Sequence, residues 1–85
     1  MGSYSLFLKK SAERDLRKVP QADLQRIIQR IKELAATPRP SSSEKLAGQD
    51  SYRIRQGNYR IVYTVDDDRQ LIEIIKIGHR REVYR

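Results

Sequence analysis

The segment YRIRQGNYRIVY, residues 52–63, predicts a β-hairpin almost residue by residue. Apolar and basic residues alternate on both sides of Gly57-Asn58, and a glycine in the first position of a two-residue loop suits a type II′ turn. Such a loop fixes the pairing of the strands and sets Arg55 opposite Arg60. Because successive side chains point to opposite faces, the hairpin separates an apolar face from a basic one. The apolar face holds Tyr52, Ile54, Ile61 and Tyr63, and the basic face holds Arg53, Arg55 and Arg60.

The basic face of this hairpin is unusual for a surface that serves folding alone. Like charges directly opposite each other destabilise a sheet by a few tenths of a kcal/mol to about 1 kcal/mol. Folding alone would favour an acid or a threonine opposite Arg55. Two interpretations follow: the three arginines bind an anion such as phosphate, or they form a solvated face that is screened by salt and that Glu73 of the next strand could pair with. The charge pattern alone does not decide between them.

The rest of the chain predicts one small α+β domain that occupies residues 1–85. Residues 4–8 form a short apolar run that is expected to be a strand. Ser11 suits the N-cap of a short helix, and Pro20 fits the first turn of a longer helix that Pro38 ends. The apolar residues of the longer helix form one stripe: Leu24, Ile27, Ile28, Ile31, Leu34 and Ala35.

The second half of the chain changes from a helical period to a period of two. The polar stretch TPRPSSSEK, residues 37–45, is expected to be a loop. Strands are expected at residues 52–56, 59–65 and 70–77, with a turn at DDDR, residues 66–69. The element order is therefore β-α-α-β-β-β, in which a two-helix hairpin covers one face of a small, mainly antiparallel sheet.

Composition limits the classes of partner and of site. The net charge of +7 and the pI of about 10.1 indicate nucleic acid, an anionic membrane surface or an acidic protein as partner. The absence of cysteine excludes disulfides and thiolate metal sites, and suits the cytoplasm. No apolar run is long enough to span a bilayer, and no signal peptide is visible. The adjacent acids at 66–68 are expected to be a solvated turn rather than a metal site, so no metal or cofactor is predicted.

The C-terminal stretch KIGHRREVYR, residues 76–85, adds further basic residues. Gly78 is expected to end the last strand, and His79, Arg80 and Arg81 follow it closely. A basic end attached to a basic sheet face could enclose one anion from two sides, and the planar fork of arginine suits phosphate. Tyr84 could stack on a base or donate a proton, and it could equally dock the tail on the core.

Three segments of the chain resemble the RelE toxins of bacterial type II toxin–antitoxin systems, within the RelE/ParE superfamily. They are YSLFLKKSAERDLRKV, KLAGQDSYRIRQGNYRIVY and IGHRREVY, and the resemblance runs from the first of them to the last, over nearly the whole chain. The resemblance implies a small sheet packed against an N-terminal helical hairpin. It also implies a ribosome-dependent endoribonuclease that cuts messenger RNA in the A site of the 70S ribosome. A cognate RelB-like antitoxin, with an acidic segment that wraps the toxin, is the implied partner, and promoter DNA is contacted only through the antitoxin complex.

The resemblance assigns candidate catalytic residues one by one. The basic pair of the hairpin falls on Arg53 and Arg55, which are lysines in the best-known form, and the strand arginine falls on Arg60. The post-strand arginine falls on Arg80, and the C-terminal tyrosine is Tyr84. The implied RNA-binding residues are Arg53, Arg55, His79, Arg81 and Lys45.

Two departures from the family pattern bear on the implied mechanism. A guanidinium stays protonated, so Arg53 or Arg55 is a poor general base. The segment between Gly78 and Tyr84 is short, which leaves Arg80 and Arg81 as alternatives and makes His79 a reserve acid or base. The expected reaction is metal-independent attack of a ribose 2′-OH on the adjacent phosphate. The alternatives are a ParE-like inhibitor of DNA gyrase and a plain RNA-binding module.

Overall fold

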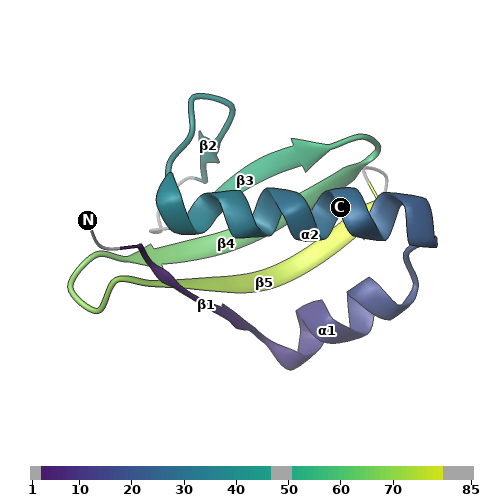
Figure 1. Ribbon diagram of the computed structural model, residues 1–85, viewed down its shortest axis with the longest axis horizontal. Helices are drawn as coiled ribbons and strands as arrows, with labels where there is room; N and C mark the ends of the chain where they lie inside the picture. Colours follow the sequence, from purple (N-terminus) through teal and green to yellow (C-terminus); the bar gives the residue numbers. More distant parts are fainter. Residues whose placement is uncertain (1–2, 47–50, 80–85) are drawn as a thin grey trace.

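The computed structural model describes residues 3–46 and 51–79, which form a five-stranded sheet and two helices (Figure 1). The strand order is β1-β5-β4-β3-β2, with β1 parallel to β5 and the other neighbours antiparallel. The predicted α+β class is confirmed. The elements are β1 (Ser5–Leu8), α1 (Lys10–Arg17), α2 (Gln21–Ala36), β2 (Glu44–Lys45), β3 (Ser51–Gln56), β4 (Tyr59–Asp66) and β5 (Leu71–His79).

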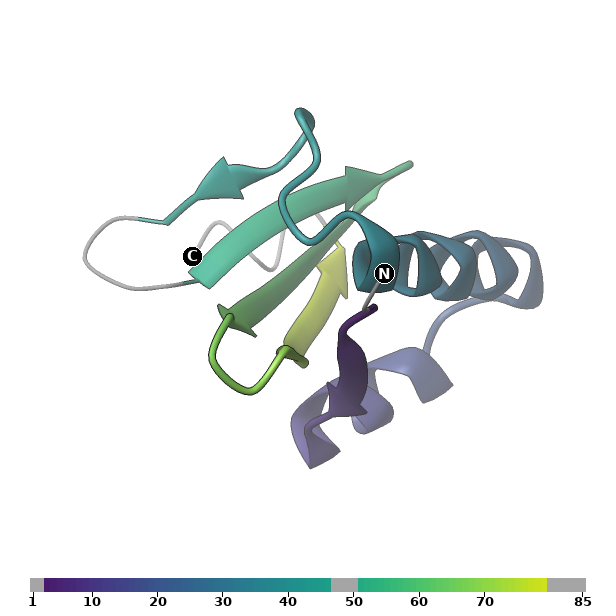
Figure 2. The ribbon, with the colours of Figure 1, turned by 60° about the vertical axis from the view of Figure 1, so that its left-hand side comes forward.

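Both helices lie on the same side of the sheet, as Figure 2 shows, and the core fills the space between the two layers. The predicted stripe of α2 is narrower than expected. Ile27 and Ile31 are buried, whereas Ile28 is 37% exposed and contributes little to the core. Among the described residues, none of the helices is long and apolar enough to cross a membrane. The buried core residues are Ala12, Val19, Ile27, Ile31, Leu34, Ile54, Ile61, Tyr63, Val65, Ile72, Ile74 and Ile77.

The start of α1 differs from the prediction. The helix begins at Lys10, the N-cap position is Lys9, and no side chain caps it, so the assignment of Ser11 as N-cap was wrong. Ser11 instead lies in the first turn and its Oγ donates a 2.7 Å hydrogen bond to the carbonyl oxygen of Ile75. One helical turn later, Asp15 Oδ2 accepts a 3.0 Å hydrogen bond from the backbone N–H of Ile77.

These two contacts occur where β5 loses its neighbour. β1 pairs with β5 only as far as Ile74, and beyond that point α1 takes the place of a strand. Buried or half-buried backbone groups need partners, and side chains four residues apart on one helix face can reach successive groups of an extended chain. The sequence therefore uses Ser11 and Asp15 to satisfy the edge of β5 rather than to cap their own helix.

A β-bulge changes which residues of β5 face the core. Val62 pairs with Lys76 and Tyr63 pairs with Ile74, so Ile75 is the extra residue. A bulge inserts one residue and reverses the alternation beyond it. Ile77 consequently joins the core although it is odd-numbered, and β5 continues through Gly78 to His79. The prediction that Gly78 ends the strand was wrong.

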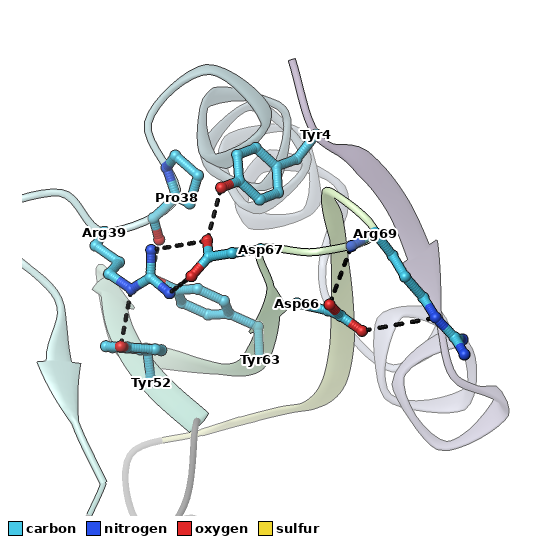
Figure 3. Close-up of polar contacts among 8 residues, drawn as sticks. All are labelled: Tyr4, Pro38, Arg39, Tyr52, Tyr63, Asp66, Asp67 and Arg69. Carbon is cyan, nitrogen blue, oxygen red and sulfur yellow. Dashed lines mark hydrogen bonds and ion pairs between the residues drawn. The ribbon is translucent and has the colours of Figure 1, made fainter. Parts of the chain in front are cut away.

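A polar network ties the loop after α2 to the turn between β4 and β5 (Figure 3). Arg39 donates from Nη2 and Nη1 to the two carboxylate oxygens of Asp67, at 2.9 and 3.2 Å. Its Nε donates to the hydroxyl oxygen of Tyr52 at 2.8 Å, and Tyr4 donates its hydroxyl to Asp67 Oδ1 at 2.7 Å. The hydrogen bonds from Arg39 and then from Tyr4 lower the pKa of Asp67. Asp67 is thus part of a clamp, although the acidic turn itself is exposed, as predicted.

Candidate functional site

The candidate site is the arginine face, defined as Arg53, Arg55 and Arg60 on the side of the sheet away from the helices. Its predicted register is confirmed, with Arg55 opposite Arg60 and Arg53 opposite Val62. Of the two loop residues, only Gly57 has a positive φ, of 60°, as a type II′ turn requires. The turn chemistry therefore fixes the pairing, and the pairing gathers the three guanidinium groups on one face.

Burial differs sharply among the three arginines. Arg60 is 5% exposed, the side chain of Arg53 is 17% exposed, and Arg55 is exposed to solvent. Gly78 lies opposite Arg60 on β5 and adds no side chain there. Removing a cation from water is costly unless it gains favourable interactions. Arg60 is therefore not an ordinary solvated charge, and the solvated-face interpretation fails for this residue.

A carboxylate from β2 completes the arginine face. Glu44 pairs with Arg53 in the sheet, and Arg53 Nη2 donates to Glu44 Oε1 at 2.8 Å. The hydrogen bond from Arg53 and the charge of Arg53 lower the pKa of Glu44, and the charges of Arg55 and Arg60 lower it further. Glu44 therefore lies on the same side of the sheet as the three arginines and pairs directly with Arg53.

Sequence reasoning missed Glu44 and named Glu73 as the possible acidic partner. Glu73 lies opposite Thr64, and the carboxylate that Arg53 contacts belongs to Glu44. The miss has a simple cause: β2 is two residues long, so it has no period of two that would distinguish it from a loop. The polar composition of residues 37–45 pointed to a loop throughout.

Lys76 is a second residue that the sequence did not reveal. It pairs with Val62, is exposed, and lies on the arginine face, because the bulge at Ile75 reverses the alternation of β5. Without the bulge, Lys76 would share the face of Ile72 and Ile74, which are core residues. A strict period of two could not predict its position.

Two predicted RNA-binding residues are not brought to the arginine face. Lys45 pairs with Tyr52, so alternation directs it to the helix side of the sheet. His79 pairs with Tyr59, and their rings form a T-shaped contact with centroids 5.6 Å apart and an angle of 81°. His79 also lines a cavity of about 200 Å³ together with Asp15 of α1. This position does not suit a reserve acid or base for the arginine face.

The remaining candidates, Arg80, Arg81 and Tyr84, lie outside the described residues. In the part of the chain that the structure describes, no group of three or more histidines, cysteines and acids is arranged to hold a metal ion. Chemically, the described part of the site offers a convergent set of cations and one carboxylate. Each guanidinium of such a set can donate to two oxygens of one anion. The set can also stabilise negative charge that develops on the anion during a reaction.

Known proteins were found that are similar to this chain in sequence and in fold. Residues 6–84 match the family described as the ParE toxin of the type II toxin–antitoxin system parDE. Toxin RelG of Mycobacterium tuberculosis is 31% identical to the chain, over 96% of this chain and 97% of RelG. The isolated E. coli RelE toxin has a TM-score of 0.81 and 30% identity, covering 96% of this chain and 92% of that one. The intact E. coli RelBE toxin–antitoxin complex contains a chain with a TM-score of 0.80 and 26% identity, covering 91% and 96%.

Proposed function

Because this chain belongs to the RelE/ParE superfamily of type II toxin–antitoxin toxins, as a RelE-type member, we propose that it is a ribosome-dependent endoribonuclease that cuts messenger RNA in the ribosomal A site. The observation that carries this proposal is the arginine face. Arg60 is buried, Arg53 is largely covered and pairs with Glu44, and Arg55 is exposed on the same face of the hairpin. An RNA phosphate carries the same kind of charge and the same paired oxygens.

The proposed reaction needs no metal ion. The ribose 2′-OH attacks the adjacent phosphorus while the bond from phosphorus to the 5′-oxygen breaks. The 2′-OH loses its proton, the departing 5′-oxygen gains one, and the products are a 2′,3′-cyclic phosphate and a 5′-OH. Arg60 stabilises the charge on the phosphorane-like transition state, and Arg53 and Arg55 hold the phosphate. Arg80, with Arg81 as its alternative, would add a cation, and Tyr84 would stack on a base or assist proton transfer.

The proposed dependence of cleavage on the ribosome rests on the poor ability of arginine to act as a general base. A guanidinium stays protonated near neutral pH, so the arginine face is better at binding charge than at removing a proton. The ribosome would then supply the missing factor by holding the messenger with its 2′-OH aligned for attack, which is an orientation effect. The ribosome as target would put the site of action in the cytoplasm.

A cognate antitoxin is the proposed protein partner. A chain of similar fold was solved in the intact E. coli RelBE toxin–antitoxin complex, and the present chain carries a net charge of +7. A partner with an acidic segment would be attracted to this charge and could cover the arginine face. Contact with promoter DNA would come mainly through the antitoxin in that complex.

Inhibition of DNA gyrase is the second candidate function, because the matching family is described as ParE toxin. A gyrase inhibitor needs a protein-binding surface and has no need of a convergent phosphate site, so the arginine face favours the ribonuclease.

The experiment that separates the two candidates uses the full-length protein in two assays. Primer extension on a translated messenger, with and without ribosomes, tests the ribonuclease, and a supercoiling assay with purified gyrase tests the alternative. Codon-phased cuts that require ribosomes, with gyrase unaffected, are expected. Gyrase inhibition without cuts would overturn the proposal in favour of the ParE-like function.

A further inference from the structure

We propose that Glu44 is an internal counter-anion: its carboxylate occupies the arginine face of the free protein and must be displaced by an RNA phosphate. Glu44 would thereby lower the affinity of the toxin for RNA that the ribosome does not hold. The identity of the displaced ligand as RNA rests on the proposed function, whereas the ion pair itself does not.

The geometry makes the carboxylate a stand-in for a phosphate. Glu44 Oε1 accepts from Arg53 Nη2 at 2.8 Å, a normal distance for a charge-assisted hydrogen bond. Carboxylate and phosphate oxygens bind the same edge of a guanidinium, so Arg53 cannot offer that Nη2 donor fully to both. The charges of Arg55 and Arg60 also lower the pKa of Glu44, and through its hydrogen bond the carboxylate competes with phosphate for Arg53.

Exposure shows which member of the pair can move. The side chain of Glu44 is 56% exposed, whereas that of Arg53 is 17% exposed. Arg53 is therefore held by its surroundings, and Glu44 can rotate into solvent without disturbing packed atoms. An ion pair with one exposed member contributes little stability, so a phosphate can displace it at small cost.

The backbone around Glu44 explains why the carboxylate is nevertheless in place. Ser43 donates its backbone N–H and its Oγ to the carbonyl oxygen of Pro40, at 2.8 and 2.7 Å. This turn reverses the chain just before β2, and the backbone N–H of Leu46 donates to the carbonyl oxygen of Ser51 at 2.9 Å just after it. The strand is thus fixed on both sides, and pairing with β3 aims Glu44 at Arg53.

The test measures binding without cleavage. A short, fluorescently labelled RNA whose 2′-OH groups are methylated is titrated with the isolated full-length protein, without ribosomes, at several salt concentrations. The variants are Glu44→Gln, Glu44→Ala and the control Glu33→Gln. Glu33 lies on α2, pairs with Arg30 at 3.6 Å and has a similarly exposed side chain, so its substitution changes the net charge equally on the other side of the sheet.

Both Glu44 variants are expected to bind the RNA about two- to fivefold more tightly than wild type, which is the effect expected for loss of one exposed ion pair. The salt dependence should become steeper by about 0.7 in logarithmic slope if one further phosphate contact forms. In an Arg53→Gln background the gain from Glu44→Gln should largely disappear.

Three results would overturn the inference: unchanged or weaker binding in the Glu44 variants, a gain no larger than that of Glu33→Gln, or an undiminished gain in the Arg53→Gln background. Because the RNA cannot be cleaved and no ribosome is present, this test is separate from that of the ribonuclease. Tighter binding by a protein that never cuts would uphold the counter-anion and reject the enzyme.

Discussion

Substitution of Asp15 by alanine should weaken β5 rather than α1, because the carboxylate of Asp15 accepts a hydrogen bond from the backbone of β5. Asp15 Oδ2 accepts a 3.0 Å hydrogen bond from the half-buried N–H of Ile77, just beyond the bulge at Ile75. The alanine variant leaves that N–H without its acceptor. A hydrogen bond to a charged group contributes about 1.5–3 kcal/mol to stability.

Part of this loss is offset because Asp15 lies near the C-terminal end of α1, where an acid opposes the helix dipole by about 0.3–1 kcal/mol. The expected net loss in unfolding free energy is therefore about 1–2 kcal/mol, which lowers the melting temperature of a domain of this size by roughly 4–8 °C per kcal/mol. Urea denaturation measures the free energy, and amide hydrogen exchange should show loss of protection at Ile77.

Two further variants make this prediction specific. Asp15→Asn keeps a carbonyl acceptor and should lose less stability than the alanine variant. Glu13→Ala removes an exposed acid from the same helix and should change the free energy by less than about 0.5 kcal/mol. If Asp15→Ala were no more destabilising than Glu13→Ala, with Ile77 still protected, then α1 would not substitute for a strand at the edge of β5.

Three other substitutions test the packing and the clamp. Asp67→Asn should reduce stability near neutral pH and make no difference in acid. The pKa of Asp67 is lowered in the folded protein, so its contribution to stability is present above the unfolded pKa and is lost as the pH falls through the folded pKa. Urea titrations at several pH values would reveal this dependence. Tyr63→Phe removes the 2.8 Å hydrogen bond to the carbonyl oxygen of Pro38 and should cost about 0.5–1.5 kcal/mol in chemical denaturation, and a neutral result would reject that bond as stabilising. Ile27→Ala should cost about 2–5 kcal/mol in the same assay, whereas the exposed Ile28→Ala should be nearly neutral, and equal losses would contradict the observed burial.

The parts of the fold that local chemistry determines could be predicted from the sequence. Gly57-Asn58 sets a two-residue loop, the loop sets the register, and alternation then assigns every hairpin side chain to a face. The grouping of Arg53, Arg55 and Arg60 follows from these steps alone.

The features that escaped prediction depend on contacts between distant elements. Ser11 resembles an N-cap by type, yet its partner is the carbonyl oxygen of Ile75, which lies in the last strand. The bulge at Ile75 has no local sequence signal, although it moves Lys76 to the arginine face and leaves His79 on the other. Glu44 belongs to a strand too short to show a period, and only its pairing with β3 reveals its role.

The most direct test of the arginine face is the rate of ribosome-dependent messenger cleavage in Arg60→Ala, compared with Lys45→Ala. Both variants remove one positive charge, but Lys45 pairs with Tyr52 and is directed away from the arginine face. Because Arg60 is buried, its substitution by alanine could disturb folding, and thermal denaturation of each variant would detect this. Arg60→Lys, which keeps the charge, and Arg55→Ala, at an exposed position, are therefore measured as well.

Loss of one donor to transition-state charge typically costs about 10²–10³ in rate. A loss of this size is expected in Arg60→Ala, with a large part of it in Arg60→Lys, because an ammonium group lacks the planar fork. Arg55→Ala should be slower than wild type, and Lys45→Ala should cut at close to the wild-type rate. A folded Arg60→Ala variant that still cuts messenger RNA as fast as Lys45→Ala would contradict the assignment of this face as the catalytic site.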